Sequence, residues 1–82
     1  MLGLDLRRQL AERAYKVAEK GSKIKLCYDV HGSYEGTMGY KDTIYTLKDV
    51  DYMGVVYMIA EDGRLFCVPY EDGLFVKVDT ET

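Results

Sequence analysis

Two Asp-Gly pairs, Asp62-Gly63 and Asp72-Gly73, interrupt the most apolar part of the sequence. A tight hairpin turn needs residues with positive φ, and Asp-Gly between apolar runs is a strong signal for such a turn. The pattern therefore predicts a three-stranded antiparallel meander. Its strands are expected over residues 54–60, 64–70 and 74–78.

The register of this meander decides which side chains form the core. A two-residue turn at Asp62-Gly63 pairs Met58 with Cys67, and paired residues share a face of the sheet. One face is then aliphatic and predicted to be the core: Val56, Met58, Ala60, Leu65, Cys67, Pro69, Leu74, Val76 and Val78. The other face is richer in aromatic residues: Val55, Tyr57, Ile59, Phe66, Val68, Tyr70, Phe75 and Lys77. A type I turn with a Gly bulge is the alternative, and it shifts the register by one and exchanges faces in the strands over residues 64–70 and 74–78.

The N-terminal part of the sequence predicts one amphipathic helix over residues 5–20. Apolar residues recur there at three- and four-residue spacing, which gives a narrow apolar stripe. Asp5 is the expected N-cap, and Gly21 is the expected left-handed residue after the helix. So narrow a stripe needs a sheet or a partner to pack against.

After the helix the apolar period changes to two, which predicts further strands. These are expected over residues 23–30, 33–40 and 43–47, with Lys41-Asp42 as a turn. Gly36 and Gly39 are expected to mark a bend, a bulge or a close backbone approach in the second of them. The whole chain, residues 1–82, is therefore predicted to be a single domain.

The order of elements predicts an N-terminal helix followed by a small, strongly bent antiparallel β barrel or roll of five to six strands. This order resembles Src-homology-3-like and Sm-like barrels, although the Sm signatures for uridine binding are absent, so ring formation and RNA binding are not implied. The aromatic face of the meander needs a cover. Three covers remain open: the helix, a second copy of the chain, or a partner.

Charge is distributed unevenly along the sequence. Residues 1–25 contain seven basic and three acidic residues, whereas residues 26–82 contain four basic and eleven acidic ones. Two interpretations follow: a nucleic-acid-binding end, or a basic helix that lies against the acidic rim of a sheet. The residues of the alternative nucleic-acid patch are Arg7, Arg8, Arg13, Lys16, Lys20, Lys23 and Lys25.

Catalysis, cofactors and metal ions have little support in the sequence. His31 is the only histidine and lies beside Gly32, with no nucleophile that the sequence places next to it. No phosphate-binding glycine motif or metal-ligand spacing is present. Cys27 and Cys67 are expected to be free thiols. We expect no enzyme, no cofactor and no metal site.

The sequence therefore predicts a non-enzymatic protein in the cytoplasm that binds a protein partner stoichiometrically, as a regulator, adaptor or inhibitor. No apolar run approaches the roughly 20 residues that span a bilayer. Short, acidic, tyrosine-rich chains resemble small regulators encoded by phages and mobile elements in composition only. The alternatives are a small nucleic-acid-binding barrel and a structural homo-oligomer such as a homodimer. The predicted partner-binding residues are Tyr34, Tyr40, Tyr45, Tyr52, Tyr57, Asp49, Asp51, Glu61, Asp62, Glu71 and Asp72.

Overall fold

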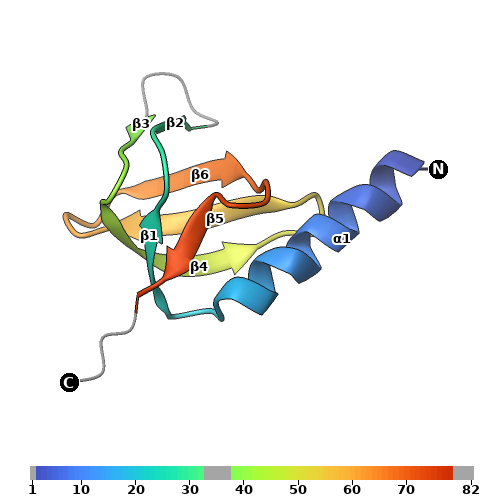
Figure 1. Ribbon diagram of the computed structural model, residues 1–82, viewed down its shortest axis with the longest axis horizontal. Helices are drawn as coiled ribbons and strands as arrows, with labels where there is room; N and C mark the ends of the chain where they lie inside the picture. The colour runs from blue at the N-terminus through green and yellow to red at the C-terminus, as the bar shows by residue number, and fades with distance from the viewer. Residues whose placement is uncertain (1, 33–37, 79–82) are drawn as a thin grey trace.

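The fold consists of one helix, a five-stranded antiparallel sheet and a separate two-stranded sheet (Figure 1). The computed structural model describes residues 2–32 and 38–78, and within them the side chains from Arg8 onward. The elements are α1 (Leu2–Val17), β1 (Lys23–Leu26), β2 (Val30–His31), β3 (Met38–Gly39), β4 (Ile44–Val50), β5 (Val55–Ala60), β6 (Leu65–Pro69) and β7 (Phe75–Lys77). The expected helix and antiparallel strands are therefore present.

The large sheet has the strand order β6-β5-β4-β1-β7. The predicted meander is wrong in its last strand, because β7 pairs with β1 and not with β6. The segment around Asp72-Gly73 carries the chain from one edge of the sheet to the other. Gly73 has a φ of +85°, so Asp-Gly does mark a turn here, but the turn does not close a hairpin.

The β5–β6 hairpin has the alternative register. Met58 pairs with Phe66, and Val56 pairs with Val68. Gly63 has a φ of +91°, and its N–H donates to the carbonyl of Ala60. This is the type I turn with a Gly bulge, and the two-residue turn predicted from the sequence is wrong.

The shifted register corrects the predicted faces. Phe66, Val68, Tyr70 and Phe75, all placed on the second face, are buried in the core. Three residues predicted to be core are instead exposed: Leu65, Pro69 and Val76. Of the remaining predicted core residues, Val56, Met58, Cys67 and Leu74 are buried, and Ala60 and Val78 are half-buried.

Three of the four aromatic side chains whose cover was in question therefore lie inside the molecule. Tyr70 and Phe75 meet edge to face, with ring centroids 5.6 Å apart. Ala14 in α1 and Ala18, just after its end, belong to the same buried cluster. The helix and the sheet thus share one core.

A bulge in β4 keeps the inner face apolar to the end of the strand. Leu47 pairs with Met58, but the register shifts before Asp49, so that Val50 pairs with Val56. Leu47 and Val50 would face opposite sides of a regular strand, since successive side chains alternate. With Lys48 as the extra residue, both are buried.

Helix α1 begins and ends about three residues earlier than predicted. Asp5 lies within the helix, so it is not the N-cap. Gly21 does have the left-handed conformation, with a φ of +88°, but it follows a short turn after Val17. Its N–H donates to the carbonyl of Leu47, which ties the end of this turn to β4.

Strands β2 and β3 form a short ribbon outside the large sheet. The predicted strand 33–40 is confirmed only at Met38–Gly39, and Gly36 lies outside the described residues. Gly39 is a close backbone approach, because a Cβ atom there would come within 2.6 Å of Leu26 and 2.9 Å of the Phe66 ring. The ribbon therefore packs on the core through a position that only glycine fits.

Candidate functional site

A hollow of about 160 Å³ lies where the ribbon meets the β5–β6 hairpin. We call it the hairpin pocket, and its lining residues are Met38, Tyr40, Tyr45, Ala60, Arg64, Leu65 and Phe66. Tyr45 and Phe66 form its aromatic base, since both are buried and their rings stack with centroids 5.8 Å apart. A cavity of about this size accepts one benzene-sized group.

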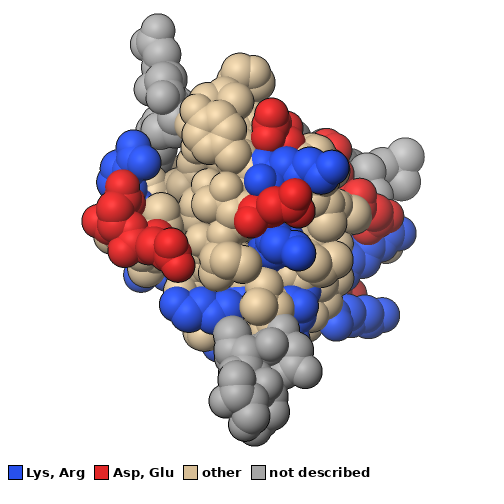
Figure 2. Space-filling model, turned by 60° about the vertical axis from the view of Figure 1, so that its left-hand side comes forward, with Lys and Arg blue, Asp and Glu red and all other residues tan. Residues whose placement is uncertain are grey.

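Large apolar side chains at the edge of the hairpin pocket are exposed. Tyr40 is 56% exposed and Leu65 is 43% exposed. Figure 2 shows the side of the molecule that carries the β5–β6 turn, where a surface without charged side chains runs between groups of acidic and basic ones. Apolar side chains gathered around a hollow are typical of a binding surface.

Arg64 is the only charged residue that lines this pocket in the described part of the chain. Its Nε donates to Asp62 Oδ2 at 2.8 Å, and its side chain is otherwise open to solvent. The backbone N–H and the guanidinium of Arg64 both lower the pKa of Asp62, with the backbone hydrogen bond as the larger cause. These contacts fix the turn and leave the terminal nitrogens of Arg64 available.

A second hollow, of about 230 Å³, lies between the ribbon and the other end of β6. We call it the ribbon pocket, and its lining residues are Tyr28, Asp29, Val30, His31, Val68, Pro69, Glu71 and Leu74. The Tyr28 hydroxyl donates to Glu71 Oε1 at 2.7 Å. Burial, followed by this carboxylate, raises the pKa of Tyr28 to about 12. The phenol is therefore protonated and remains a donor at neutral pH.

The predicted tyrosines do not form one continuous surface. Tyr40 and Tyr45 line the hairpin pocket, although Tyr45 contributes only its buried ring. Tyr52 is 72% exposed and lies in the β4–β5 turn, and Tyr57 lies in β5. Tyr34 lies outside the described residues.

The predicted acidic residues also fall into separate places. Asp51 holds the β4–β5 turn, because its carboxylate accepts from the N–H groups of Met53 and Val55 and from the Tyr57 hydroxyl. Glu61 and Asp62 lie at the β5–β6 turn, and Glu71 and Asp72 lie in the segment before β7. The described residues therefore do not form one continuous acidic rim.

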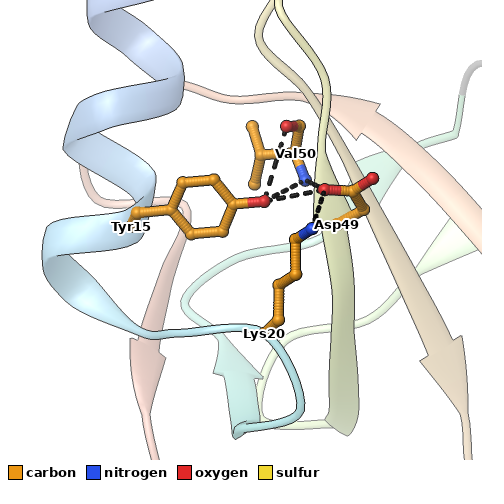
Figure 3. Close-up of polar contacts among 4 residues, drawn as sticks. All are labelled: Tyr15, Lys20, Asp49 and Val50. Carbon is orange, nitrogen blue, oxygen red and sulfur yellow. Dashed lines mark hydrogen bonds and ion pairs between the residues drawn. The ribbon is translucent and has the colours of Figure 1, made fainter.

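Asp49 ties the helix to the bulge of β4 (Figure 3). The Tyr15 hydroxyl donates to Asp49 Oδ1 at 2.8 Å and accepts from the Val50 N–H at 2.9 Å. The Lys20 ammonium lies 3.4 Å from the same carboxylate oxygen. The hydrogen bond from Tyr15 is the main reason that the pKa of Asp49 is lowered, while burial and this carboxylate raise the pKa of Tyr15. The cluster is a structural joint between helix and sheet.

Two of the basic residues of the alternative nucleic-acid patch are paired with acidic residues of the sheet side. Arg13 lies 3.3 Å from Asp72, and Lys20 pairs with Asp49. Lys23 donates to the Thr46 hydroxyl, whereas Lys16 is exposed. The side chain of Arg7 lies outside the described part. These pairs fit the interpretation of a basic helix against an acidic rim.

Sequence reasoning missed Met38, Arg64 and Leu65 as pocket residues, and Tyr28 as a partner of Glu71. Leu65 was missed because the register was wrong by one residue. Tyr28 and Glu71 are distant in sequence, and only the crossing of the chain to β7 brings them together. An exposed leucine beside a bulged turn is the one signal that could have indicated the site.

The chain has no significant match among protein-family models, curated proteins or solved structures. Any function therefore has to be argued from its own geometry. Both cysteines are free thiols, as expected. Within the described residues, no helix has the length and apolar character needed to cross a bilayer.

Proposed function

We propose that this chain is a non-enzymatic cytoplasmic protein that binds a protein partner stoichiometrically, with the hairpin pocket as the centre of contact. The observation that carries the proposal is the exposure of Tyr40 and Leu65 beside a hollow with an aromatic base. Tyrosine and apolar anchors that fill a pocket supply most of the affinity of many interfaces. The hollow has room for one large side chain of the partner.

The lining of the hairpin pocket supports binding over catalysis. Its described members are apolar or aromatic apart from Arg64. General acid-base chemistry needs a second positioned titratable group within hydrogen-bond reach. A lone exposed guanidinium beside a hollow with an aromatic base is suited to recognition.

The strand order supports the finer part of the fold prediction. The last strand, β7, lies beside the first, β1, and the 70–74 connection joins the two outer strands β6 and β7. A small barrel of the Src-homology-3-like or Sm-like kind remains our proposal for this architecture. Such a scaffold holds turns rigidly at its ends, where binding residues are usually carried.

The proposed function can be tested by site-specific photo-crosslinking in the native cells. A photoreactive phenylalanine analogue at Tyr40 should give a discrete protein adduct, whereas the same analogue at Tyr52, which is more exposed but distant from the pocket, should not. The captured protein is then purified and its affinity for the unmodified chain is measured.

Two matched variants separate a specific site from general stickiness. Leu65 and Val76 are 43% and 45% exposed and lie on the two outer strands of the sheet. Leu65→Asp should weaken binding by about tenfold or more, as expected for a hot spot, while Val76→Asp should leave it unchanged. Equal effects of both variants would contradict the proposal. Salt-sensitive binding of DNA or RNA that disappears when Arg13 and Lys16 are substituted would contradict it as well.

A further inference from the structure

The ribbon pocket combines apolar walls with an acidic mouth. Val30, Val68 and Leu74 are buried and supply the walls. Asp29 and Glu71 are exposed residues that line the same hollow. A long cationic side chain has the matching form, with an apolar stem and a charged end.

The hydrogen bonds of the two carboxylates leave one oxygen of each for a ligand. Glu71 uses Oε1 to accept from the Tyr28 hydroxyl, and Asp29 uses Oδ1 to accept from the Lys41 N–H at 2.7 Å. No contact to Glu71 Oε2 or Asp29 Oδ2 is present within the described residues. Tyr28 lines the hollow as well, and an aromatic ring attracts a cation that lies over its face.

A metal ion is not the occupant that this arrangement favours. No three His, Cys, Asp or Glu side chains of the described residues come together closely enough to hold one. His31 lies at the edge of the pocket and is exposed. An organic cation, which needs fewer and more widely spaced acceptors, fits the geometry better.

We propose that the ribbon pocket binds a Lys or Arg side chain of the protein partner whose apolar residue fills the hairpin pocket. This deepens the proposed function and rests on it. Strand β6 lines both hollows, with Leu65 and Phe66 in one and Val68 and Pro69 in the other. At about 3.3 Å per residue, the two hollows are about 10 Å apart along the strand, a distance that about three residues of an extended partner segment cover.

The inference can be tested without the partner by NMR titration of the intact protein. The probe is Nα-acetyl-arginine methylamide, and Nα-acetyl-citrulline methylamide is the uncharged control of nearly the same shape. Amide signals of Tyr28, Val30 and Leu74 should shift with arginine in the millimolar range. Citrulline should bind about fivefold or more weakly.

A pair of variants assigns the effect to the charge of Glu71. Glu71→Gln retains an oxygen that accepts from Tyr28 but removes the charge, and it should weaken arginine binding by about fivefold. Glu61→Gln, on the β5–β6 turn, should not change it. Equal binding of arginine and citrulline, shifts located elsewhere, or no shifts at about 20 mM probe would overturn the inference. The crosslinking result at Tyr40 is independent of this titration, so the two proposals can fail separately.

Discussion

Met58 and Phe66 lie directly opposite each other across the β5–β6 ladder, and both side chains are buried. This pairing places the neighbouring Leu65 on the outside of the sheet. The two adjacent residues of β6 therefore have opposite environments. Their substitution is a direct test of the register.

Phe66→Ala should lower the free energy of unfolding by about 3–5 kcal/mol, because it leaves a cavity beside Tyr45 and Met58. Leu65→Ala should cost less than about 1 kcal/mol, since this residue is already 43% exposed. Urea denaturation monitored by circular dichroism measures both. The opposite ranking would indicate the two-residue turn.

Gly39→Ala should destabilise the protein by about 1–3 kcal/mol, because the new methyl group would meet Leu26 Cδ1 at 2.6 Å. The same substitution in a Leu26→Ala background should cost less, since the closest clash is removed while the contact with the Phe66 ring at 2.9 Å remains. A double-mutant cycle from thermal or urea unfolding gives this coupling. Additive costs would show that the ribbon does not pack on Leu26.

Tyr15→Phe should cost about 1 kcal/mol of stability. The variant removes the hydroxyl that accepts from the Val50 N–H and donates to Asp49, but the Val50 N–H keeps a second acceptor in Asp49 Oδ1 at 2.8 Å. Tyr52→Phe, at an exposed position, is the control and should be neutral within about 0.5 kcal/mol. Chemical denaturation of the two variants side by side checks the difference.

Stability should depend on Asp49 in acid. The pKa of this carboxyl is lowered in the folded protein, so its contribution is present above the ordinary Asp pKa and is lost as the pH falls through the folded-state value. The stability difference between the wild type and Asp49→Asn should therefore be larger at pH 7 than near pH 2.5. An unchanged difference would show that the Asp49 charge has no favourable partner.

At high pH the sign is reversed for Tyr28. Its pKa is raised to about 12, mainly by burial and next by Glu71, so the phenol contributes stability below pH 10 that is lost as the pH rises toward 12. Site-resolved NMR of the Tyr28 ring should report this titration. In Glu71→Gln the pKa should move down only part of the way, because the burial remains.

The sequence sufficed for the elements whose signals are local. The helix and the turns at Lys41-Asp42 and Asp62-Gly63 are present, with shifted ends for the helix. The strand predicted over residues 23–30 is instead broken into β1 and β2, which lie in different sheets. The type of turn at Asp62-Gly63, two-residue or bulged, depends on packing across the whole hairpin. Because β6 has apolar residues on both faces, its sequence does not favour one register over the other.

The partners of β7 and the two pockets could not be predicted. Asp72-Gly73 indicates a turn, but a turn does not determine which strand the next segment pairs with. The pockets depend on where the ribbon packs, since both are lined by residues from the ribbon and from β6. Local patterns indicated a close approach at Gly39 as one possibility, but not which residues it would meet or where β7 would pair.

The pairing of β7 with β1 also has a consequence for how the chain assembles. Strands β4, β5 and β6 are consecutive, and short loops connect them, so their pairing has a small loop-closure cost. The β1–β7 ladder joins residues about fifty positions apart and has a larger loop-closure cost. We therefore expect the β4–β5–β6 meander to form before the β1–β7 ladder. A chain in which β7 has not yet paired can already hold β1 through its ladder with β4, but it lacks the contact between β7 and the helix.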